Sequence, residues 1–154
     1  MSSRLNYPKI APVPYEAMMG LGSYLEHCGL DSKLMHMVRL RCSQINGCAY
    51  CVDMHSRDAR LAGEPERRVH SVAVWEESPL FDEKEKAAFA WAESLTHLSE
   101  THAPDAVWER VRAHFNEKEL ADLTWLVASI NAWNRLGVGL RSQPPAKWPK
   151  LPAE

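Results

Sequence analysis

Residues 31–63 read DSKLMHMVRLRCSQINGCAYCVDMHSRDARLAG. Apolar side chains recur there at helical spacing, Asp31 is a preferred type of residue for a helix N-cap, and Asn46-Gly47 and Gly63 are typical of helix ends. The stretch therefore predicts two helices, over about residues 31–45 and 48–62, which meet at a tight reversal around Asn46-Gly47.

Helical spacing also dominates the remainder of the chain, and no stretch alternates apolar and polar residues over a useful length. Further helices are predicted over about residues 14–28, 65–75, 82–98, 105–115 and 116–139, and the last begins with the capping-box pair Asn116 and Glu119. Prolines favour extended arms over about residues 1–13 and 142–154. We expect a single all-α domain over residues 1–154, built as a bundle of about seven helices.

The composition is that of an ordinary globular protein, and it excludes several classes of function. The net charge of −2 leaves no basic excess for binding nucleic acid. The chain has neither a run of about eighteen apolar residues nor a signal-peptide pattern at its start, so we expect no membrane partner and a cytoplasmic location. The four cysteines suit a reducing compartment, where a C-x-x-C pair is more often catalytic or metal-binding than a structural bridge.

Cys48, Cys51 and His55 are spaced so that all three lie on one face of the second predicted helix. At this spacing the two cysteine Cα atoms fall within the roughly 4.4–6.8 Å that a disulfide needs. Cys48 is expected in the first turn, where unpaired N–H groups and the helix dipole stabilise a thiolate. His36 lies about as far before the reversal as His55 lies after it, so we expect the two imidazoles to meet, with Tyr50 beside them.

Other interpretations of these residues stay open. The C-x-x-C pair could consist of buried core cysteines, as we expect for Cys28 and Cys42, and the six tryptophans more often fill a core or a subunit interface than bind a ligand. From a different class of function, the two thiolates and two imidazoles named above make up a tetrahedral zinc-binding set.

Three segments carry a family resemblance: RLRCSQINGCAYCVDMHSRDARLAGE (39–64), AFAWAESLTHL (88–98) and SINAWNRLGVGLR (129–141). They resemble the AhpD-like alkylhydroperoxidase branch of the carboxymuconolactone decarboxylase superfamily, over about residues 5–141. The central signature of that branch is a Glu, eleven residues and then C-x-x-C-x-x-x-H, which this chain matches from Cys48 onward.

The resemblance implies a role for each residue of the motif. Cys51 is then the peroxidatic thiol, Cys48 the resolving thiol and His55 part of a proton relay. The chain departs from the pattern at His36, which occupies the position of the family Glu, and at Tyr50, where some hydroperoxidases have another histidine. Glu93 is a family-like carboxylate that could take over part of the relay.

The resemblance also implies a hydroperoxide substrate, a separate thiol or protein reductant, no bound cofactor, and a homo-oligomer assembled as a hexamer from three dimers. We therefore expect a thiol-dependent alkylhydroperoxidase with a peroxiredoxin-type antioxidant activity, or a disulfide oxidoreductase. The zinc site is one alternative. Decarboxylation of a lactone, the reaction that names the superfamily, is the other.

Overall fold

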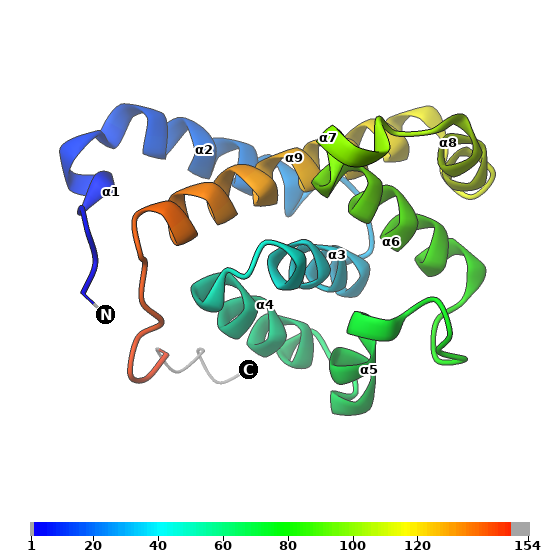
Figure 1. Ribbon diagram of the computed structural model, residues 1–154, viewed down its shortest axis with the longest axis horizontal. Helices are drawn as coiled ribbons and strands as arrows, with labels where there is room; N and C mark the ends of the chain where they lie inside the picture. Colours follow the sequence, from blue (N-terminus) through cyan, green and yellow to red (C-terminus); the bar gives the residue numbers. More distant parts are fainter. Residues whose placement is uncertain (1, 149–154) are drawn as a thin grey trace.

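Nine α-helices and one 3₁₀ helix build residues 2–148, the part of the chain that the computed structural model describes (Figure 1). In chain order they are α1 (Tyr7–Ile10), α2 (Pro12–Leu25), α3 (Ser32–Ile45), α4 (Ala49–Leu61), α5 (Glu66–Ser71), η1 (Val72–Val74), α6 (Glu83–Thr96), α7 (Leu98–Thr101), α8 (Asp105–Arg112) and α9 (Glu117–Gly139). No strand occurs within residues 2–148, so the predicted all-α fold is confirmed.

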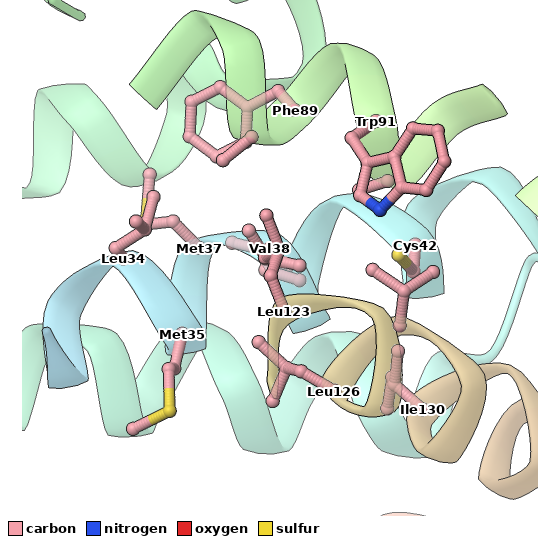
Figure 2. Packing of buried hydrophobic residues seen from close by; sticks show 14 of the residues in the cluster. Leu34, Met35, Met37, Val38, Cys42, Phe89, Trp91, Leu123, Leu126 and Ile130 are labelled. Carbon is pink, nitrogen blue, oxygen red and sulfur yellow. The ribbon is translucent and has the colours of Figure 1, made fainter. Parts of the chain in front are cut away.

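The central helix of the bundle is α3. It packs against α4, α6 and α9, which surround it in Figure 1. Figure 2 shows Met37 and Val38 of α3 between Phe89 of α6 and Leu123 and Leu126 of α9, and all five side chains are buried. Burying one such side chain contributes roughly 1.5–3 kcal/mol, so this core fixes α3, and with it the reversal that leads into the cysteine pair.

Local capping explains why the predicted starts of α3 and α9 are confirmed. Asp31 Oδ1 accepts a hydrogen bond of 2.9 Å from the backbone N–H of Leu34. Asn116 and Glu119 form the reciprocal box at α9, where each side chain accepts the backbone N–H of the other at 2.9 Å. These bonds depend only on residues within one turn, which is why the sequence reveals them.

The predicted extended arm over residues 1–13 is wrong in part. Residues Tyr7–Ile10 form α1, and α2 begins at Pro12, because a proline in the first turn of a helix lacks only an N–H that has no helical partner there. The prediction of about seven helices also misses α7; it and α1 have 4 residues each, too few to show a hydrophobic repeat. Residues 142–148 are non-helical as predicted, and the rest of that arm lies outside the described residues.

The N-terminal segment is tied to the end of α9. The backbone N–H of Arg4 donates to the carbonyl of Leu140 at 2.9 Å, and its guanidinium donates to the carbonyl of Gly139 at 2.9 Å. Further along, the ring of Tyr15 packs edge-on against Trp133, with the centroids 5.7 Å apart. These contacts hold α1 and α2 against α9.

Within residues 2–148, every helix is too short or too polar to span a bilayer.

Candidate functional site

The two cysteines of the C-x-x-C motif lie at the start of α4. Gly47 has a φ of +66°, a left-handed conformation that glycine adopts easily and that turns the chain from α3 into α4. Cys48 is the N-cap residue of α4, and its Sγ accepts the backbone N–H of Cys51 at 3.4 Å. The Cα atoms are 5.3 Å apart and the two side chains form a disulfide. The predicted proximity of the pair is confirmed, with Cys48 one position before the first turn.

Asn46 links the turn between α3 and α4 to α9 through hydrogen bonds. Its side-chain amide donates to the Oδ1 atoms of Asn131 and Asn134, both at 2.9 Å. Both asparagines are buried, and buried polar groups of this kind need a partner to offset their loss of water. The network therefore fixes the position of the α3–α4 turn relative to α9.

The backbone of α9 lies close to the sulfurs at Gly137. A Cβ atom on Gly137 would lie 2.8 Å from Cys48 Sγ and 3.6 Å from Cys51 Sγ. Because the first distance is shorter than any ordinary contact, the disulfide leaves no room for a side chain here. Cys48 is 1% exposed and Cys51 is 3% exposed, so α9 covers the pair rather than leaving it at the surface.

His55 and His36 approach each other from α4 and α3, with ring centroids 6.3 Å apart. Burial, and after it the positive charge of Arg39, lowers the pKa of His55 to about 3 and lowers the pKa of His36 as well. Among the described residues, the Nδ1 atom of each ring is buried without a hydrogen-bond partner. Both imidazoles are therefore neutral at pH 7, and each keeps a ring nitrogen available for a proton or a ligand.

Asp58 lies beside the two histidines and is not among the site residues predicted from the sequence. One nitrogen of each imidazole and one oxygen of Asp58 all lie within 4.8 Å of one another. Burial raises the pKa of Asp58, while His36 and Arg57 oppose that shift, and Arg57 Nη1 donates to Asp58 Oδ1 at 3.0 Å. The available signal was its position three residues after His55, which places both on one helix face.

Two neutral imidazoles and a carboxylate can pass a proton to or from a nearby thiol, and divalent transition metals accept the same donors. The zinc alternative raised from the sequence needs both sulfurs as free thiolates, whereas here Cys48 and Cys51 are bonded to each other. With the two cysteines bonded to each other, the donors that remain together are His36, His55 and Asp58, with one ligand atom from each within 4.8 Å of the others.

A cavity of about 930 Å³ opens beside this cluster. Its lining includes Cys51, His55, His36, Asp58 and Tyr50, but does not include Cys48. The other walls come from the N-terminal segment, α2, α9 and residues just after α9. Of the two cysteines, only Cys51 therefore lies beside a small molecule in the cavity.

The last two residues predicted for the site lie in different places. Tyr50 lines the cavity, and burial raises the pKa of its phenol, which is therefore protonated at neutral pH. Glu93 instead accepts hydrogen bonds from Arg41 Nε and Trp75 Nε1, both at 2.6 Å, and is not part of the cavity lining. The structure does not bring Glu93 to the cavity, so its suggested share in a relay has no geometric support.

The helices and the cysteine pair together define an AhpD-like all-α protein. Residues 12–94 match the carboxymuconolactone decarboxylase family, and the chain belongs to that family. It is 35% identical over 147 residues to the uncharacterised protein YdfG of Bacillus subtilis, which covers 96% of this chain and 100% of YdfG.

The solved structures that are similar to this one include two proteins described below. ATU0492 of Agrobacterium tumefaciens, a protein of unknown function proposed to be an antioxidant defence protein AhpD, is 42% identical with a TM-score of 0.92, over 95% of this chain and 100% of that chain. The debrominase Bmp8 is 21% identical with a TM-score of 0.80, over 88% of this chain and 73% of that chain, and so shares the fold. The resemblance to the AhpD-like branch is confirmed.

Proposed function

We propose that the protein is a thiol-dependent hydroperoxidase, which reduces organic hydroperoxides with Cys51 and Cys48. The observation that carries the proposal is the asymmetry of the pair: Cys51 lines the cavity beside His55, and Cys48 does not. The family resemblance, which makes the second cysteine of the motif the peroxidatic one, supports the same assignment.

The first step is oxidation of Cys51. Its thiol gives its proton to the cluster of His36, His55 and Asp58, and the start of α4 stabilises the thiolate that remains. The thiolate attacks the outer oxygen of the hydroperoxide, so that a sulfur–oxygen bond forms and the oxygen–oxygen bond breaks. The alkoxide leaves as an alcohol with the proton that the cluster took from the Cys51 thiol, and Cys51 becomes a sulfenic acid.

The second step is resolution by Cys48. Its sulfur attacks Cys51, a disulfide forms, and hydroxide leaves as water with the proton of the Cys48 thiol. The product of this step is a Cys48–Cys51 disulfide, and the two cysteines lie close enough to form it, with Cα atoms 5.3 Å apart. A dithiol or a protein thiol outside this chain must supply two electrons and two protons to restore the reduced pair.

Asp58 has a defined part in this proposal. The AhpD-like pattern carries a carboxylate where this chain has His36, and Asp58 restores a negative charge to the same cluster from the other helix. Its charge raises the pKa of His36 and so opposes the lowering by burial. We assign to Asp58 the positioning of the imidazoles and the stabilisation of their protonated forms.

The proposal is tested by counting thiols before and after one equivalent of cumene hydroperoxide in reduced wild type, Cys48→Ser and Cys51→Ser. Wild type should fall from four thiols to two, because Cys42 is fully buried with a pKa raised to about 12 and Cys28 has no nearby cysteine partner. Cys48→Ser should accumulate a sulfenic acid that dimedone traps, and Cys51→Ser should not react.

Three outcomes would contradict this scheme. An inert Cys48→Ser with an oxidisable Cys51→Ser would exchange the two roles. Rapid exchange with dithiols and no reaction with hydroperoxides would identify a disulfide oxidoreductase. Turnover of a carboxymuconolactone by Cys51→Ser would favour the decarboxylase alternative.

We also propose that the protein acts in the cytoplasm, where thiols are kept reduced, and that it assembles as a homo-oligomer, a trimer of dimers. Light scattering coupled to size-exclusion chromatography tests the assembly, with a mass of six chains of 17.5 kDa expected. A monomeric mass would exclude it.

A further inference from the structure

Four aromatic side chains from separate parts of the chain gather around the cavity: Tyr7 of α1, Tyr15 of α2, Tyr50 of α4 and Trp133 of α9. Tyr15 packs edge-to-face against Tyr7, with centroids 6.1 Å apart, and against Trp133, with centroids 5.7 Å apart. These three rings form a continuous aromatic wall, which the contacts between the N-terminal segment and α9 hold in place.

Two of the aromatic residues are close in the chain to residues beside the sulfurs. Tyr50 directly precedes Cys51 in α4. Trp133 lies one turn before Gly137 in α9, and Gly137 is the residue whose backbone packs on both sulfurs. Cys51 lines the same cavity as the wall, so an organic group that lies on the wall shares that cavity with Cys51.

The cavity is far larger than the smallest hydroperoxide requires. Its volume is about 930 Å³, whereas a water molecule takes up about 30 Å³ in the liquid and hydrogen peroxide has only one more oxygen atom. Pockets of about 300–1,000 Å³ with apolar walls and a few converging polar groups are typical of sites for larger organic ligands. Here the polar part of the lining includes the cluster of His36, His55 and Asp58.

We propose that the aromatic side chains form a subsite for the organic part of the substrate, and that this part is a flat, bulky apolar group such as an aryl ring. The inference rests on the proposed function and narrows it to hydroperoxides that carry such a group. The ring packs edge-to-face on Tyr15 and Trp133 while the –OOH group extends to Cys51. The chemistry is the oxidation of Cys51 described above, with an aryl-substituted alcohol as the product.

The first test measures second-order rate constants for oxidation of the reduced protein by cumene hydroperoxide, tert-butyl hydroperoxide and hydrogen peroxide. Cumene hydroperoxide should react fastest, by about tenfold or more over the other two. The ratio of the cumene to the hydrogen peroxide rate constant should fall about three- to tenfold in Tyr15→Leu. The control is Trp125→Leu, which also changes an aromatic residue of the chain but at an exposed position of α9 outside the cavity, and should keep the ratio.

Tyr7→Leu is the second variant in case Tyr15→Leu does not fold, because Tyr7 sits in the short α1. Equal rate constants for the three hydroperoxides in wild type would overturn the subsite. An unchanged ratio in a folded variant at Tyr15 or Tyr7 would do the same.

The second test uses calorimetry with the oxidised protein and two unreactive alcohols, 2-phenylpropan-2-ol and tert-butanol. The aryl alcohol should bind at least about tenfold more tightly, and Tyr15→Leu should weaken it. Binding of the aryl alcohol by a protein that no hydroperoxide oxidises would leave the subsite standing and refute the proposed function. Oxidation without discrimination, combined with no difference between the alcohols, would refute the subsite alone.

Discussion

Replacing Gly137 by alanine tests whether α9 packs directly on the disulfide. The added Cβ would lie 2.8 Å from Cys48 Sγ, closer than carbon and sulfur atoms approach in proteins. The sulfur has no easy way to move, because it is bonded to Cys51 and is 1% exposed. Overpacking of this kind costs about 1–3 kcal/mol. Alanine in place of glycine inside a helix also stabilises the helix by up to about 1 kcal/mol. The net change in the free energy of unfolding is therefore smaller than the cost of the contact itself.

A matched control isolates the cost of the contact. Gly20 lies within α2, and a Cβ there has no heavy atom within 4 Å, so Gly20→Ala should show only the gain from helix propensity. We expect the free energy of unfolding of Gly137→Ala to be lower than that of Gly20→Ala by about 1–3 kcal/mol. For a chain of this size that corresponds to roughly 2–12 °C in Tm.

Urea denaturation of the oxidised proteins, followed by circular dichroism, gives both values. The decisive background is Cys48→Ala, in which the sulfur that remains near the new Cβ is Cys51 Sγ at 3.6 Å, an ordinary contact. There Gly137→Ala should behave like Gly20→Ala. If Gly137→Ala matches the control in wild type, or if its penalty persists without the Cys48 sulfur, the proposed packing is refuted.

Three further predictions concern the charged and titrating groups. The wild-type free energy of unfolding should fall as pH drops from 6.5 towards 3, because the unfolded chain binds a proton at His55 in that window. The folded imidazole, with its pKa of about 3, does not bind that proton. His55→Gln should flatten the slope of this free energy against pH in urea titrations, and an unchanged slope would show that the ring is not buried in its neutral form. Glu93→Gln should lower the free energy of unfolding by about 1–3 kcal/mol, because it leaves the Arg41 guanidinium without its carboxylate partner. The rate of Cys51 oxidation should stay the same. A slower rate without any loss of stability would show that Glu93 takes part in the reaction. Asp58→Asn should lower the pKa of His36 further, slow the oxidation of Cys51 and move the low-pH limb of the rate profile to lower pH. Adding His36→Glu to the same chain should restore the rate of Cys51 oxidation. If this double variant folds and the rate does not recover, Asp58 is not part of the relay.

The sequence predicts the helices that begin at strong local signals and the cysteine pair that lies within one turn. Asp31, Asn116 and the Asn46-Gly47 reversal act through bonds to residues a few positions away, so their effect is visible without tertiary structure. Proline misleads at the N-terminus, because the same residue that favours extended chain is also accepted in the first turn of a helix, as at Pro12.

The site is predicted only as far as it is local to α3 and α4. Asp58 shares a helix face with His55, but its importance depends on its distance from His36, which belongs to the other helix. Glu93 has the right residue type on a helix that packs against α3, yet Arg41 and Trp75 bind its carboxylate. Which of two carboxylates reaches a cavity is decided by tertiary contacts that a one-dimensional pattern does not contain.

The long helix α9 links the stability of the fold to the shape of the site. One part of it, at Leu123 and Leu126, closes the core against α3, and its later residues Asn131, Asn134 and Gly137 hold the reversal and cover the sulfurs. A helix that is fixed at one end by a hydrophobic core can hold a reactive pair at the other end with little freedom to separate. The same rigidity keeps Trp133 in the cavity wall, so the packing that stabilises the bundle also sets which molecules can reach Cys51.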